Sequence, residues 1–184
     1  QTLYFSNKHS KENKFVSDKT KAIIINSPNN PTGAIYSRES LEKLNKALEK
    51  KEAELGINIF IISDEPYVSL VYDGAEVPNI LSIFKKSISI NSFSKSLALP
   101  GERIGYIAAS SRIPEVGTLM SIMITLNRTL GFVNAPSLFQ KVIADNLDAL
   151  AHAGCHRCEA FPVVFGQAIL DGDDGKTINP GFKE

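Results

Sequence analysis

Two short apolar runs rich in isoleucine, at residues 22–25 and 57–62, constrain the fold of this chain more than any other feature. Both are almost uninterrupted by polar residues, a pattern typical of a strand buried on both faces, as in a parallel sheet. A polar turn follows each run, at residues 26–33 and 63–67. Open α/β sheets bind ligands at the carboxyl ends of their strands, so the sequence predicts that a ligand site includes these two turns.

A helix is predicted between the two runs. Ser37 suits its N-cap and Gly56 suits its C-terminal stop. Apolar side chains recur between them near the helical period, at Leu41, Leu44, Ala47, Leu48 and Leu55. The lysines and glutamates in between are most simply the solvated face of the helix, and we assign them no function.

Two further strands are predicted at residues 87–91 and 103–109. Only seven residues separate Lys95 from Arg103, which is too few for a crossover helix, and Pro100 with Gly101 favours a turn. The last strand is therefore expected to return antiparallel. The whole pattern predicts an α/β fold with a mostly parallel sheet.

Residues 114–130 and 134–151 are predicted to form two helices, with Pro114 and Pro136 in their first turns and Asn134 as a cap for the second. The first carries a wide apolar face made of Leu119, Ile122, Met123, Leu126 and Leu130. Core packing is the first interpretation of this face, and a subunit interface is the second.

Lys95 lies between groups that suit an anion. Ser92 and Ser94 offer hydroxyls just before it, and Arg103 offers a planar fork of donors that fits phosphate. Taken alone, this pattern also fits a solvated lysine, serines in a turn, and an ion pair between Arg103 and Glu102 or Asp64. An enzyme that forms a Schiff base to a phosphorylated cofactor needs a lysine beside a phosphate site.

Asp64 and Tyr67 follow the second apolar run. A carboxylate at a strand end can hold a pyridine nitrogen protonated, and a phenol three residues on can reach the same ring. Taken alone, these residues are more simply interpreted as a helix cap (Asp64) and a core residue (Tyr67). Glu65 is expected to be a loop charge rather than a participant.

These motifs together resemble those of the class I/II aminotransferases, the aspartate-aminotransferase-like, fold-type I pyridoxal phosphate enzymes. The resemblance covers residues 20–145 and rests on Asn30-Pro31-Thr32-Gly33, the Asp64-x-x-Tyr67 spacing, and residues 92–106. It implies an α/β three-layer sandwich in which Lys95 forms the Schiff base. By the same resemblance Asp64 contacts the pyridine nitrogen and Asn30 and Tyr67 contact the ring oxygen. Ser92, Ser94 and Arg103 hold the phosphate.

The resemblance also implies pyridoxal 5'-phosphate as cofactor, an amino acid (aspartate or an aromatic amino acid) and a 2-keto acid as substrates, and a homodimer. Residues 20–150 are expected to be an incomplete cofactor-binding large domain, and residues 151–184 a remnant of the C-terminal small domain or a tail, because family members are about twice this length. Two alternatives stay open: a carbon–sulfur β-lyase that shares these motifs, and an inactive fragment that only self-associates or binds cofactor. No residue convincingly matches the family's substrate-carboxylate arginine.

Composition narrows the kinds of partner and the cellular compartment that we expect for the chain. Twenty basic and twenty acidic side chains cancel, which gives no reason to expect nucleic acid or an anionic membrane as partner. Two cysteines make no disulfide framework, so the cytoplasm is the expected compartment. His152, Cys155, His156 and Cys158 invite a zinc interpretation, but one Cys-x-x-Cys without a second pair does not predict a metal site. Residues 1–7 resemble an expression-tag scar, and residues 1–19 are expected to form a flexible lead-in.

Overall fold

The computed structural model describes residues 2–4, 16–145, 167–170 and 177–178, and within them a sheet of seven strands in sequential order. The strands are β1 Thr2–Tyr4, β2 Ala22–Asn26, β3 Phe60–Asp64, β4 Ser87–Ser92, β5 Gly105–Ser110, β6 Gln167–Leu170 and β7 Thr177–Ile178. Strands β1 to β4 are mutually parallel, β5 is antiparallel to β4, and β6 is parallel to β5. The mostly parallel sheet and its antiparallel return are confirmed.

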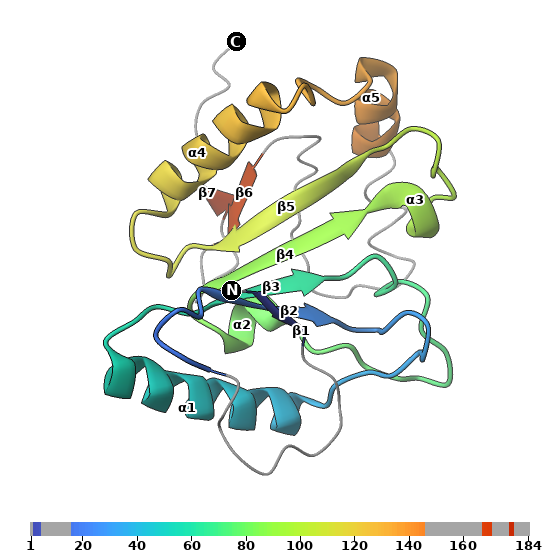
Figure 1. Ribbon diagram of the computed structural model, residues 1–184. Helices are drawn as coiled ribbons and strands as arrows, with labels where there is room; N and C mark the ends of the chain where they lie inside the picture. Colours follow the sequence, from blue (N-terminus) through green and yellow to red (C-terminus); the bar gives the residue numbers. More distant parts are fainter. Residues whose placement is uncertain (1, 5–15, 146–166, 171–176, 179–184) are drawn as a thin grey trace.

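Five helices accompany the sheet in the described part of the chain: α1 Arg38–Leu55, α2 Ile80–Ile83, α3 Phe93–Ser96, α4 Val116–Thr129 and α5 Ser137–Asp145. Leu41 and Leu48 of α1 pack in one core cluster with Ile23 and Ile61 of the sheet. Met120 of α4 packs on β4 and β5 in a second cluster. Figure 1 shows α1 and α4 on opposite sides of the sheet, which confirms the three-layer sandwich.

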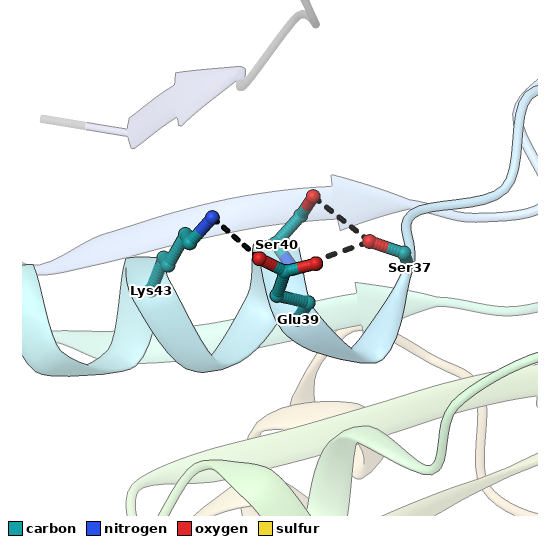
Figure 2. Close-up of polar contacts among 4 residues, drawn as sticks. All are labelled: Ser37, Glu39, Ser40 and Lys43. Carbon is teal, nitrogen blue, oxygen red and sulfur yellow. Dashed lines mark hydrogen bonds and ion pairs between the residues drawn. The ribbon is translucent and has the colours of Figure 1, made fainter.

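The residues predicted to cap α1 at its two ends do so in the structure. Ser37 has extended dihedrals, and its Oγ accepts a hydrogen bond from the Ser40 backbone N–H at 3.2 Å. Glu39 in the first turn pairs with Lys43 at 2.7 Å, one turn further along the helix (Figure 2). Gly56 adopts the left-handed conformation at φ 64°, and its N–H donates to the Glu52 carbonyl. Because caps depend only on nearby residues, the predicted helix agrees with the structure to within a residue.

The two isoleucine-rich strands are more deeply buried on one face than on the other. Ile23 and Ile61 are almost fully buried toward α1, whereas Ile24 and Ile62 on the opposite face are half-buried. The strands are therefore buried as predicted on the face that α1 covers, but the prediction is wrong for the opposite face, which is only half-buried. The physical reason is coverage, since α4 packs over β4 and β5 rather than over β2.

The apolar face of α4 is buried only along one edge. Met120 is fully buried and Leu119 and Met123 pack against the core, as predicted for the latter two. Ile122, Leu126 and Leu130 are 51%, 55% and 72% exposed, so the core interpretation is wrong for them. The interface interpretation of these three side chains stays a prediction.

The chain's first residues take part in the sheet. β1 pairs in parallel with β2, with Thr2 opposite Ala22 and Tyr4 opposite Ile24, whereas we expected residues 1–19 to be a flexible lead-in. The predicted tail features, including the histidine and cysteine cluster and the end of the second late helix, lie outside the described residues. None of the helices in the described part combines the length and apolarity needed to cross a membrane.

Candidate functional site

The candidate site lies at the carboxyl ends of β2, β3 and β4. Asn26 is the register partner of Asp64, and Asp64 is the partner of Ile90, so the first two strands end side by side. β4 runs on to Ser92 and passes directly into α3, which carries Lys95. Parallel pairing thus delivers the polar segments after three strands to one edge of the sheet, as the sequence predicted for the first two.

Tyr67 is the point where these turns meet. The Asn30 side-chain amide donates a hydrogen bond to the Tyr67 hydroxyl at 3.0 Å, across 37 residues of chain. The Lys95 ammonium lies 6.0 Å from the centroid of the same ring, within the range of a cation–π contact. Asn30 and Lys95 are exposed and Tyr67 is half-buried. Three predicted site residues, two from loops and one from α3, are therefore brought together.

Asp64 joins this group through a residue that sequence reasoning did not assign to the site. The Asn26 side-chain amide donates to the Asp64 backbone oxygen at 3.0 Å and to its carboxylate Oδ2 at 3.4 Å. Partial burial raises the pKa of the Asp64 carboxyl above its usual value. A polar residue at the matching end of each neighbouring strand was the signal that could have revealed Asn26.

The residues predicted to bind the phosphate, Ser92, Ser94 and Arg103, are less tightly assembled. The Arg103 guanidinium donates through Nη1 to the Pro100 carbonyl at 2.9 Å, which closes its own turn, and the Arg103 backbone is left-handed at φ 52°. In residues 16–145 no hydrogen bond or ion pair links Arg103 to Ser92, Ser94 or Lys95. The same residues also show no ion pair from Arg103 to Glu102 or Asp64. A guanidinium has five N–H donors, so most of the fork remains for an anion.

Gly105 fixes how closely β5 approaches the strand that carries Ser92. The two residues are register partners, and a Cβ atom at position 105 would lie 2.4 Å from the Asn91 carbonyl oxygen. Such a contact is sterically forbidden, so the close pairing requires glycine. Gly105 thereby helps to place the end of β4 and the short helix with Lys95.

Glu65 is turned into the protein, contrary to the prediction of a loop charge. Its carboxylate Oε2 accepts a hydrogen bond from the Ser89 hydroxyl at 2.7 Å, and its backbone N–H donates to the Ile90 carbonyl at 2.8 Å. Burial raises the pKa of the Glu65 carboxyl, and the hydrogen bond from Ser89 opposes this rise. Glu65 thus ties the end of β3 to β4 below the site.

The chemistry of this donor set fits pyridoxal phosphate. A carboxylate, an amide–phenol pair, an amine and a guanidinium surround one edge of the sheet, and each type matches a different part of that molecule. Within the described residues, no group of three or more histidine, cysteine, aspartate or glutamate side chains is placed to hold a metal ion.

Comparison with known proteins gives a consistent result. A family model described as aminotransferase class I and II matches residues 6–153. An aspartate aminotransferase of Bacillus sp. (strain YM-2) is 45% identical over 119 residues, which are 62% of this chain and 29% of that protein. An aromatic-amino-acid aminotransferase 2 of Thermococcus litoralis is 41% identical over 107 residues, 55% of this chain and 25% of that protein.

The structural comparison covers a similar part. The crystal structure of an amino transferase from Eubacterium rectale superposes with a TM-score of 0.68 at 47% identity. The match covers 71% of this chain and 33% of the other. The chain therefore spans about a third or less of the length of the proteins it resembles.

Proposed function

The chain belongs to the class I and II aminotransferase family, and from this membership we propose that it provides the cofactor-binding core of a pyridoxal phosphate-dependent aminotransferase. The observation that carries the proposal is the convergence on Tyr67 of Asn30 and Lys95, beside Asp64. Proposed substrates are an amino acid and a 2-keto acid. Aspartate or aromatic amino acids are favoured by the names of the similar enzymes.

When bound, pyridoxal phosphate supplies an aldehyde that joins to an amine and a ring that accepts an electron pair. Lys95 is the proposed amine, because its Nζ lies over the Tyr67 ring at the shared edge of the sheet. With its Nζ free, Lys95 would act as the general base that takes up the proton of the substrate α-carbon and later gives it back. Lys95 is thus both the anchor and the general base in this proposal.

The remaining side chains hold and orient the ring. Asp64 keeps a proton on the ring nitrogen, and a positive charge there favours the ionised carboxylate against the effect of burial. Asn30 and Tyr67, already hydrogen-bonded to each other, would donate to the ring oxygen through the Tyr67 O–H and the second N–H of the Asn30 amide. Ser92, Ser94 and Arg103 bind the phosphate, with the Pro100 carbonyl holding one guanidinium nitrogen in place.

A second copy of the chain is the proposed protein partner, and the cytoplasm the proposed compartment. Exposed apolar side chains on α4, such as Ile122 and Leu126, support a partner because water solvates them poorly.

Spectroscopy of the purified chain tests the central proposal. Adding pyridoxal phosphate should produce an absorbance band near the visible edge that Lys95→Ala abolishes and the exposed helix variant Lys46→Ala keeps. Arg103→Ala should weaken cofactor binding by about tenfold to a hundredfold, the worth of a hydrogen bond to a charged group. A band of equal strength in Lys95→Ala, or equal cofactor affinity in Arg103→Ala and the parent, would contradict these assignments.

The reaction class needs a separate assay. Incubation of the loaded protein with aspartate or an aromatic amino acid should release the matching keto acid without free ammonia, whereas a carbon–sulfur β-lyase releases ammonia from a sulfur-containing amino acid. A cofactor-dependent band with neither product indicates a cofactor-binding fragment without turnover.

A further inference from the structure

We propose that Asn26 is a positioning residue that holds the Asp64 carboxylate and the Asn30 loop in register with each other, so that both contact the cofactor ring together. This inference rests on the proposed function, because it concerns the same ring. It assigns a role to Asn26, whose side chain reaches neither Lys95 nor the residues proposed to bind the phosphate.

Within the part of the chain that the structure describes, the Asn26 side chain makes four hydrogen bonds, and they lead to the end of β3 and to the turn after β2. Its Nδ2 donates to the Asp64 backbone oxygen at 3.0 Å and to Oδ2 at 3.4 Å. Its Oδ1 accepts from the Asn30 backbone N–H at 2.9 Å and from the Asn29 side-chain amide at 3.2 Å. One side chain therefore bridges the end of β3 and the turn after β2.

The chemistry of the partners explains why an amide is required at position 26. The Asn30 N–H can only donate, so it must face an oxygen, and the Asp64 carbonyl can only accept, so it must face an N–H. A carboxylate at position 26 would keep the first contact and lose the second. An apolar residue would lose both, which would leave the turn and the strand end free to shift independently.

The strand register makes this bridge possible. Asn26 and Asp64 are direct partners on adjacent parallel strands, so their side chains emerge on the same face of the sheet. Tyr67 closes the arrangement on the far side through its hydrogen bond with Asn30. The result is a ring of contacts running from Asn26 to Asp64, through the turn to Tyr67, and back through Asn30.

Titration of Asp64 tests the first half of the proposal without any cofactor. A hydrogen bond to the carboxylate stabilises its charged form, so Asn26→Ala should raise the pKa of Asp64 by about half a unit to one unit. Carbon-13 NMR of the labelled side chain measures this value. Asn29→Ala is the matched control, because Asn29 lies in the same turn and contacts Asn26 but not Asp64. An unchanged Asp64 pKa in Asn26→Ala, or an equal rise in Asn29→Ala, would overturn the proposal.

A second variant keeps this test valid where alanine disturbs folding. Asn26→Asp is isosteric and still accepts from the Asn30 N–H, but it sets a second carboxyl beside Asp64. Two adjacent carboxyls titrate in two separate steps, with the upper one raised. A single, unsplit Asp64 titration in Asn26→Asp would show that the two side chains are not neighbours.

Cofactor analogues test the second half. The parent should bind pyridoxal phosphate more tightly than the analogue with carbon in place of the ring nitrogen, by about tenfold. In Asn26→Ala this ratio should fall at least threefold, whereas a variant that is merely less stable keeps it. A parent that gives no Lys95-dependent absorbance band refutes the proposed function, while the Asp64 titration still decides the role of Asn26. A parent that gives the band, with the full ratio retained in Asn26→Ala, refutes only the present inference.

Discussion

Replacing Gly105 by alanine should disrupt the pairing of β4 with β5 at the point that leads to Lys95. A Cβ atom there would lie 2.4 Å from the Asn91 carbonyl oxygen and 3.1 Å from the Cα atom of Ser92. Since Cβ contacts essentially never fall below 3.0 Å, the strands must separate by about 0.6 Å, the difference between these two distances. Both obstructing atoms belong to the backbone, so no side-chain rotation can relieve the clash.

The expected cost follows from this forced movement. Overpacking of a well-packed region destabilises by about 1–3 kcal/mol, and we expect Gly105→Ala to lose stability in this range. Urea unfolding followed by far-ultraviolet circular dichroism measures the free energy of unfolding. Cofactor affinity should fall as well, because the shift occurs at Ser92, three residues before Lys95.

Gly101→Ala is the matched control for this variant. Gly101 lies in the preceding turn, no atom lies within 4 Å of a Cβ there, and its φ lies outside the left-handed range. Its effect should stay within about 0.5 kcal/mol. A loss below that value in Gly105→Ala, or equal losses in the two variants, would refute the argument that close strand approach requires glycine at position 105.

Two other predictions concern Glu65, which ties β3 to β4 next to the site, and the N-cap of α1. Burial gives the Glu65 carboxyl a raised pKa in the folded chain, so the stabilisation linked to its proton is complete below the unfolded pKa and is lost as pH rises through the folded value. Glu65→Gln carries no such proton, so its stability relative to the parent should increase as pH rises above the ordinary glutamate pKa of about 4.3. A difference that does not change with pH in urea unfolding would contradict this. Ser37→Ala removes the N-cap of α1 and should cost about 1 kcal/mol of unfolding free energy. Ser121→Ala within α4 should cost less, and equal losses would exclude a capping effect.

The sequence predicted most of the local structure. Ser37 and Gly56 bound α1 as expected, and each predicted strand core lies within an observed strand or overlaps one. The short gap between Lys95 and Arg103 correctly required an antiparallel return. These features depend on residues close in sequence, through caps, periodicity and loop length, so they can be read without knowing the rest of the fold.

Burial was harder to predict than secondary structure. The apolar face of α4 and the outward face of β2 looked like core residues, yet Leu126 and Leu130 are exposed and Ile24 is half-buried. For Glu65 the prediction was wrong in the opposite sense. We expected a loop charge, but Ser89 on the next strand donates a hydrogen bond to its carboxylate in the interior. Hydrophobic pattern shows which face of an element is apolar, but only the placement of neighbouring elements decides whether that face is covered.

The amino-acid sequence alone determined the kind of fold and the chemical types available at its strand ends: an amine, a carboxylate, a phenol and an amide. The tertiary structure decided which of them meet. Asn26 contacts Asp64 across 38 residues and Asn30 contacts Tyr67 across 37, whereas Arg103 bonds to its own turn. The reason is that strand register and the paths of the loops set these long-range distances, and both result from packing the whole sheet rather than from any local run of residues.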